Sequence, residues 1–181
     1  FSGEFPPHFV DRANRFLPDD IAIRNIFPTD DSQHARFEAN YRAYAYHLSW
    51  QKDPFRQQTL TYERRAKNFD PALLQEAAQL LLPYKDFTTF CKTGSDAKTM
   101  KCELYRSEWE FREQEWVYHI AANRFLRGMV RLIVGMCLSV AAGKLSIEEV
   151  KTAMEQQQRL SKSLSVAPDG LYLTEVRYPF L

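Results

Sequence analysis

The chain has 181 residues, of which 45% are hydrophobic and 26% are charged, and its formal net charge is +1. This length and apolar content suit one full-sized globular domain or a large lobe, and they argue against intrinsic disorder. The near-neutral charge excludes a uniformly basic surface, so any anion site must be local. Cys91, Cys102 and Cys137 are odd in number and form no CxxC pair, which predicts buried thiols in a reducing cytosol.

The first half of the chain is expected to contain a short helix and two strands. Apolar residues at helical spacing after Pro6 and Pro7 predict a helix over Phe9–Leu17. Three isoleucines predict a strand over Asp20–Phe27, and strict alternation within Ala35–Trp50 predicts a long strand with one aromatic face. The polar segment Asp53–Phe69 reads as a loop, either solvated or in contact with anions.

The second half of the chain predicts helices packed on a hairpin. Asp70 begins an amphipathic helix that ends before Pro83, and Cys102–Arg112 with Trp116–Ile120 alternates as a β-hairpin. A helix is expected over Arg124–Ala142, another after a capping box at Ser146, and a last strand over Leu171–Tyr178. The fold class is therefore α+β, a mostly antiparallel mixed sheet with helices packed on it.

Three arginines of the Arg124–Ala142 segment share one side of the expected helix. At roughly 100° per residue, Arg131 lies about 20° and Arg127 about 60° from Arg124 around the axis. An ordinary solvated face is one explanation. Arg131, however, lies in an apolar run between Val130 and Leu132, where a guanidinium needs a carboxylate or phosphate partner. The stripe therefore suits RNA phosphates, and Arg131 suits a buried carboxylate.

Four segments together resemble the tRNA pseudouridine synthase A family, over about Leu17 to Pro179. They are Asn123-Arg-Phe-Leu-Arg-Gly-Met-Val-Arg-Leu-Ile-Val-Gly135, His34-Ala-Arg-Phe37 leading to Arg42-Ala-Tyr-Ala-Tyr46, Asp86-Phe-Thr-Thr-Phe90, and Gly170-Leu-Tyr-Leu173 before Tyr178-Pro179. The resemblance implies a pseudouridine synthase-like fold and an enzyme that isomerises uridine to pseudouridine in the anticodon stem-loop of tRNA. It also implies a homodimer that needs no cofactor. The cysteine usage predicts a cytoplasmic location, and the histidine spacing predicts no metal.

The same resemblance assigns catalytic roles to two residues. Tyr44 matches the tyrosine that stacks on the flipped uridine, and Arg131 matches the arginine that pairs with the nucleophilic aspartate. An aromatic face and base extrusion are what chemistry on a stacked base requires. Contacts with tRNA are expected from His34, Arg36, Arg42, Arg124 and Arg127.

No segment matches the family's Arg-Thr-Asp-x-Gly-Val-His motif, and Asp96 in Gly94-Ser-Asp-Ala97 lacks its flanks. Since the chain also starts at Phe1, we expect residues 1–181 to be the carboxy-terminal lobe of an enzyme whose aspartate lies in an amino-terminal lobe. The chain alone should then be inactive.

Two other functional classes compete with a modifying enzyme. One is a non-catalytic RNA-binding or dimerisation module with the same fold, which would bind tRNA with steep salt dependence but form no pseudouridine. The other is a metal-dependent or nucleophilic hydrolase, which the histidine spacing and the lack of GxSxG and P-loop motifs disfavour. No signal peptide or membrane span is expected, because the apolar run Met129–Ala142 falls short of about 20 residues.

Overall fold

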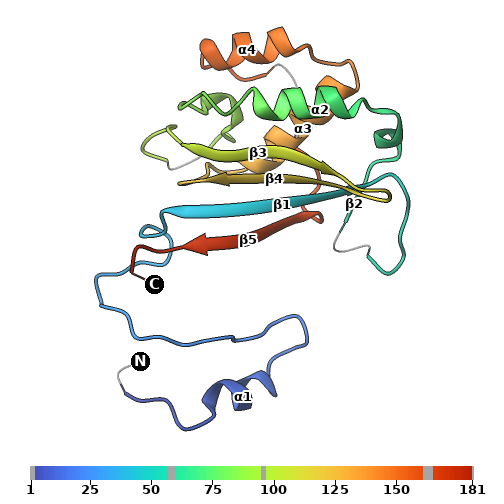
Figure 1. Cartoon of the computed structure of the whole chain (residues 1–181). Helices are drawn as coiled ribbons and strands as arrows, with labels where there is room; N and C mark the ends of the chain where they lie inside the picture. The colour runs from blue at the N-terminus through green and yellow to red at the C-terminus, as the bar shows by residue number, and fades with distance from the viewer. Residues whose placement is uncertain (1–2, 57–59, 95–96, 161–164, 181) are drawn as a thin grey trace. The chain divides into compact units, whose positions relative to one another are not determined.

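The computed structural model describes residues 3–56, 60–94, 97–160 and 165–180 (Figure 1). Its contacts divide the chain into two units, Phe1–Ala35 and Arg36–Leu181. The first unit contains the expected helix as α1 (Phe9–Asn14). The strand predicted over Asp20–Phe27 is wrong, because no strand forms there. Instead, the Asn14 side chain bonds both the N–H and the carbonyl of Ile23, at 2.7 and 2.8 Å, and occupies the groups that a strand partner would need.

A five-stranded sheet forms the centre of the second unit. Its strands are β1 (Tyr41–Ser49), β2 (Thr61–Tyr62), β3 (Leu104–Phe111), β4 (Trp116–Ala122) and β5 (Leu171–Arg177). The order is β2-β1-β4-β3, and β5 pairs with β1. Because β4 pairs with β1 from Arg42 to Leu48, β2 and β5 lie end to end along the other edge of β1. Among the strand pairs that the described residues form, only β1 and β2 are parallel, so the α+β prediction of a mostly antiparallel mixed sheet is confirmed.

Three helices cover one face of this sheet: α2 (Pro71–Gln79), α3 (Met129–Ala141) and α4 (Ile147–Glu155) (Figure 1). The predicted caps are present, since Asp70 accepts from the N–H of Ala72 and Ser146 forms its capping box with Glu149. Short 3-10 helices, η1 (Arg64–Asn68) and η2 (Thr88–Phe90), connect the larger elements.

The alternation of β1 places its large side chains beneath the helices. In the antiparallel register with β4, Tyr46 lies opposite Tyr118 and Leu48 opposite Trp116, and all four are buried. The three cysteines are free and buried, as expected. Burial raises the pKa of the Cys102 thiol to about 11 and that of Cys137 to about 12, so both are protonated at neutral pH.

Two predicted boundaries are corrected by tertiary contacts. The segment Asp53–Phe69 is not only a loop, because it contributes β2 and η1 within its described part. The helix expected from Arg124 begins instead at Met129, after Gly128 adopts a left-handed conformation (φ 73°). A Cβ at Gly128 would lie 2.8 Å from the Lys92 side chain, so the chain crosses Lys92 closely at this turn.

Candidate functional site

Tyr44 lies at an irregularity in the sheet, on the face that carries the helices. The pairing between β1 and β5 shifts by one residue at the step from Ala43 to Tyr44, so that Thr174 has no partner residue in β1. Such bulges re-aim side chains and commonly border functional sites. The Tyr44 ring is half-buried and meets Phe125 edge-on, with ring centroids 5.1 Å apart. Burial raises the pKa of its phenol, partly offset by the charge of Arg42, so the hydroxyl is protonated at neutral pH.

Arg131 is held in one orientation in the first turn of α3. Its Nε donates a 2.6 Å hydrogen bond to the carbonyl of Val166, whose N–H donates back to the Arg131 carbonyl at 3.3 Å. Within residues 3–56, 60–94, 97–160 and 165–180, no acidic side chain forms an ion pair with this guanidinium. The two terminal nitrogens therefore keep the planar fork that binds a carboxylate or phosphate.

Tyr44 and Arg131 border the same layer between the sheet and α3. Tyr46, two residues along β1 on the face of Tyr44, lies within electrostatic reach of Arg131. Phe125, against the Tyr44 ring, belongs to the short segment that leads into α3. An aromatic ring and a fixed cation over one stretch of β1 are what an enzyme needs to hold a planar base and an anionic group.

The predicted stripe of three arginines on one helix is wrong. Arg124 and Arg127 precede α3, because the left-handed turn at Gly128 breaks the helical path. Arg127 is exposed and donates from Nη1 to the carbonyl of Gly94 at 3.0 Å, whereas Arg124 is half-buried near Cys102. These guanidinium groups therefore lie on a loop beside the start of α3.

Of the remaining expected RNA contacts, Arg42 has a structural role as well. Its Nη1 donates to the carbonyls of Ala39 (2.9 Å) and Asn123 (3.1 Å), and its Nη2 donates to that of Arg36. Arg36 is exposed and stacks over Phe37, with 5.5 Å from its guanidinium carbon to the ring centroid. His34 is exposed in the first unit, whereas the other six expected site residues belong to the second.

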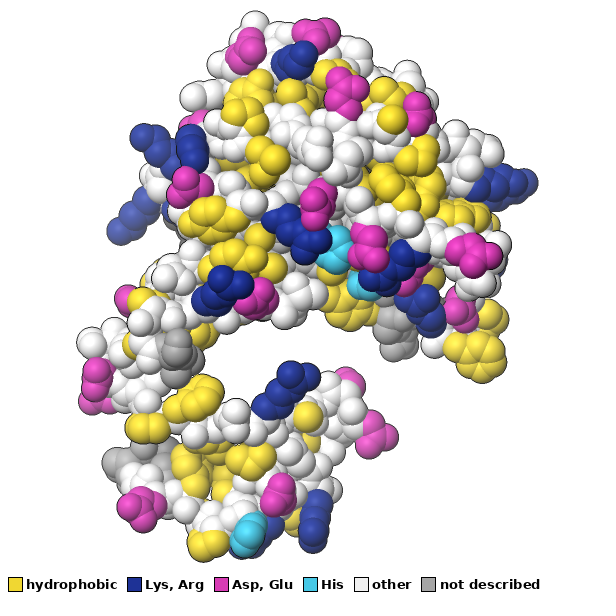
Figure 2. Space-filling view, viewed as in Figure 1, with side chains coloured by type: hydrophobic (Ala, Val, Ile, Leu, Met, Phe, Trp, Pro, Cys, Tyr) yellow, Lys and Arg dark blue, Asp and Glu magenta, His cyan; other side chains and the backbone are white. Residues whose placement is uncertain are grey.

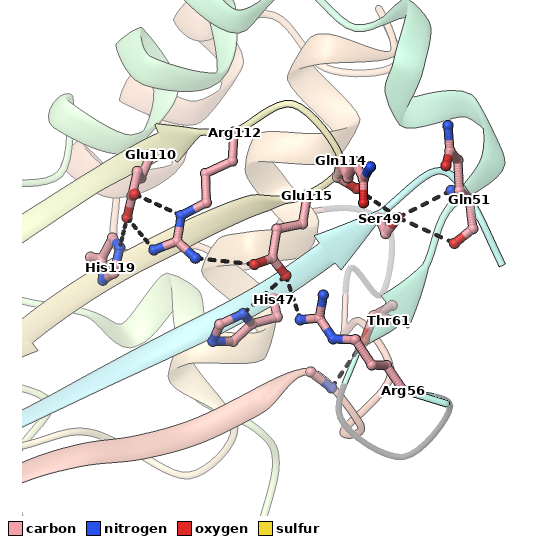
Figure 3. Close-up of polar contacts among 11 residues, drawn as sticks. His47, Ser49, Gln51, Arg56, Thr61, Glu110, Arg112, Gln114, Glu115 and His119 are labelled. Carbon is pink, nitrogen blue, oxygen red and sulfur yellow. Dashed lines mark hydrogen bonds and ion pairs between the residues drawn. The ribbon is translucent and has the colours of Figure 1, made fainter. Parts of the chain in front are cut away.

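The sheet face opposite the helices carries charges that neutralise one another. Figure 3 shows Glu115 between His47, Arg56 and Arg112, and Glu110 between Arg112 and His119, with the helices behind the sheet. In Figure 2 as well, cationic and anionic side chains are interspersed rather than gathered into a field of one sign. This open face therefore offers little net attraction to a polyanion.

The arginines near the start of α3 differ from those of the open face. Among the described residues, Arg42, Arg124, Arg127 and Arg131 form no ion pair with an acidic side chain. Uncompensated guanidinium groups are the ones that can neutralise RNA phosphates. These four guanidinium groups are therefore available to an anionic ligand on the side of Tyr44 and Arg131.

Three contributors to this region were missed from the sequence. The Val166 carbonyl orients Arg131, the buried hydroxyl of Tyr46 contacts the Ala167 carbonyl, and Thr61 bonds to Tyr46. Alternation could have placed Tyr46 on the face of Tyr44. No side-chain pattern could have indicated a backbone carbonyl, and Thr61 lay in the segment interpreted as a loop.

The described part of the chain shows no features of a metal site or of a membrane-spanning helix. There, no group of three or more His, Cys, Asp or Glu side chains is arranged to hold a metal ion. Nor does any helix described here combine the length and apolarity needed to cross a bilayer.

Comparisons with known proteins point to one family. A family model described as tRNA pseudouridine synthase matches residues 77–179. The tRNA pseudouridine synthase A of Porphyromonas gingivalis is 42% identical over 172 residues, which cover 94% of this chain and 68% of that protein. Those of Bacteroides fragilis (40%) and Parabacteroides distasonis (39%) also match 94% of this chain and 67% of their own lengths. The chain therefore spans about two thirds of these relatives, and it belongs to the tRNA pseudouridine synthase family.

Proposed function

We propose that the complete gene product converts uridine to pseudouridine in the anticodon arm of tRNA. In this isomerisation the bond from the ribose C1′ to N1 breaks and a bond from C1′ to C5 forms. The C5 proton leaves to solvent and N1 gains a proton, so no oxidant or other reactant is needed. The family membership of the chain supports the reaction class.

The observation that carries the proposal is the state of Arg131. Its Nε is fixed on the Val166 carbonyl, and no carboxylate among the described residues uses the rest of the guanidinium. In the proposed enzyme the arginine pairs with a nucleophilic aspartate from a part of the protein outside these 181 residues. Tyr44 stacks on the extruded base, and its protonated phenol is placed for proton transfer.

Substrate binding is proposed to use the uncompensated arginines. Arg124 and Arg127 lie beside the start of α3, and Arg42, Arg36 and His34 are assigned to tRNA from the family resemblance. We also propose a homodimer without a cofactor on that resemblance alone, and a cytoplasmic location on the three unpaired cysteines. These assignments predict binding that weakens with salt, because each phosphate contact releases counterions.

Release of tritium from tRNA labelled at uridine C5 tests the activity directly. The complete gene product is expected to release tritium, and the 181-residue chain alone is expected to release none. Turnover by the chain alone would refute the assignment of the nucleophile. Binding of tRNA by the complete product without tritium release would favour a non-catalytic RNA-binding module instead.

Two substitutions in the complete gene product test the site residues. Arg131→Ala should lower turnover by at least about a hundredfold, the usual effect of removing a preorganised charged donor. Tyr44→Phe should lower it by roughly a hundredfold or more if the phenol transfers a proton. Arg106→Ala and Tyr105→Phe are matched controls on β3, where Arg106 pairs with Glu108 and Tyr105 is exposed. Wild-type turnover in Arg131→Ala or Tyr44→Phe would remove that residue from the mechanism.

A further inference from the structure

A short segment, Val166–Gly170, is attached both to α3 and to the sheet; we call it the strap. At one end, Val166 exchanges hydrogen bonds with Arg131, through the arginine Nε and through the backbone. At the other end, the Gly170 carbonyl accepts from the N–H of His47 at 2.8 Å. The carbonyl that orients Arg131 therefore depends on where the strap lies.

Tyr46 and Thr61 bind the middle of the strap. The Tyr46 hydroxyl lies 2.9 Å from the Ala167 carbonyl oxygen and 2.8 Å from the Thr61 Oγ1. The N–H of Gly170 donates to the same Thr61 oxygen at 3.2 Å, the contact drawn at Thr61 in Figure 3. Strap positions 167 and 170 are thus linked through two side chains, one on β1 and one on β2.

The direction of these hydrogen bonds follows from what each group can donate. A carbonyl only accepts, so the single Tyr46 proton points to Ala167. Thr61 must then donate to the Tyr46 oxygen while it accepts from Gly170. This series of hydrogen bonds runs from the Gly170 N–H through the Thr61 and Tyr46 hydroxyl groups to the Ala167 carbonyl. Burial raises the pKa of Tyr46 to about 12, mainly by desolvation, so its proton stays in place at neutral pH.

We propose that Tyr46 and Thr61 are positioning residues for Arg131. By fixing Ala167 and Gly170, they hold the neighbouring Val166 carbonyl at the 2.6 Å that orients the guanidinium. Without this anchor, the Val166 carbonyl is free to move, and the arginine fork loses its fixed direction. The proposal rests on the proposed function, because a fixed Arg131 affects catalysis only if that residue pairs with the reacting aspartate.

A second buried tyrosine provides a matched control. Tyr118, opposite Tyr46 in the sheet, has the same 0% exposure. Its hydroxyl bonds instead to Ser107, which also donates to the Ala78 carbonyl in the helical layer. Tyr46→Phe and Tyr118→Phe therefore remove the same group from the same core, but only the first substitution releases the strap.

Steady-state turnover of the complete gene product tests the proposal. Tyr46→Phe is expected to lower kcat between roughly tenfold and a hundredfold, the effect of a small misplacement of a catalytic group. The KM for tRNA should change by less than about twofold, because the strap provides no proposed phosphate contact. Tyr118→Phe should keep the wild-type kcat at a temperature where both variants are folded.

Two further variants separate positioning from a general loss of stability. Thr61→Val removes the hydroxyl that links Gly170 to Tyr46, with little change in side-chain volume, and should lower kcat. Thr61→Ser keeps a hydroxyl and should have a kcat close to that of the wild type. Adding Tyr46→Phe to Arg131→Ala should not lower kcat further, because both substitutions act through the Arg131 guanidinium. If Tyr46→Phe does not fold, Thr61→Val carries the test.

The outcomes distinguish this inference from the proposed function. A complete wild-type protein that releases no tritium refutes the function itself. An active wild type in which Tyr46→Phe and Thr61→Val keep the wild-type kcat refutes the positioning role alone. An equal decrease in kcat in Tyr46→Phe and Tyr118→Phe would also refute the positioning role, because it would reflect damage to the core.

Discussion

Gly170 offers a sharp test of how closely the strap fits against β1. A methyl group added there would overlap the His47 carbonyl oxygen and would lie 2.9 Å from Thr61 Oγ1 and 3.2 Å from the Thr61 nitrogen. Two of these three atoms are backbone, so no rotamer change can relieve the contact. Gly170→Ala must therefore separate the strap from β1 or from β2.

The cost of this substitution can be worked out from its parts. Inserting a methyl group into packed surroundings costs about 1–3 kcal/mol. Weakening the hydrogen bond from His47 to Gly170 costs about 1 kcal/mol more. We expect the free energy of unfolding to fall by about 2–4 kcal/mol, which corresponds to a decrease in Tm of roughly 5–15 °C.

Gly143→Ala is the matched control for the glycine substitution. Gly143 has φ +66°, and in the described chain nothing lies within 4 Å of an added Cβ, so its cost is backbone strain alone. That strain is about 1–2 kcal/mol. Urea and thermal unfolding of the complete gene product measure both variants. If Gly170→Ala is no more destabilising than Gly143→Ala, the close approach of strap and strands is refuted.

Three further predictions concern charge and burial. Arg127→Ala should weaken tRNA binding and lower the slope of log affinity against log salt concentration by about one unit, as expected for one lost phosphate contact. Arg106→Ala, which removes an arginine that is ion-paired in the wild type, should leave that slope unchanged. Filter binding at several salt concentrations measures both variants. Arg112 and His119 lower the pKa of Glu110 from 4.5 to about 2, so its contribution to stability is present above about pH 5 and lost as pH falls toward 2. The Tm difference between wild type and Glu110→Gln should shrink over that range, and a constant difference would contradict the ion pairs. Buried Cys102 and Cys137, with pKa values raised to about 11 and 12, should not react with a disulfide reagent at pH 8 until the protein unfolds; rapid labelling of the native protein would contradict this.

Local sequence determined much of the secondary structure of the second unit. Alternation predicted β1 and the β3–β4 hairpin, because a strand with one buried face needs a period of two. The caps at Asp70 and Ser146 predicted α2 and α4, because these side chains satisfy N–H groups that every helix leaves unbonded. The family resemblance, not periodicity, separated Tyr44 from Tyr46.

Only tertiary structure decided the features that depend on distant partners. Asp20–Phe27 has the composition of a strand, but Asn14 rather than a neighbouring strand bonds Ile23. Lys92 packs against the left-handed turn at Gly128, which moves Arg124 and Arg127 off the helix. Arg131 needed a partner by its sequence context, and the fold supplied the carbonyl of Val166, a group that every residue carries and no sequence pattern marks.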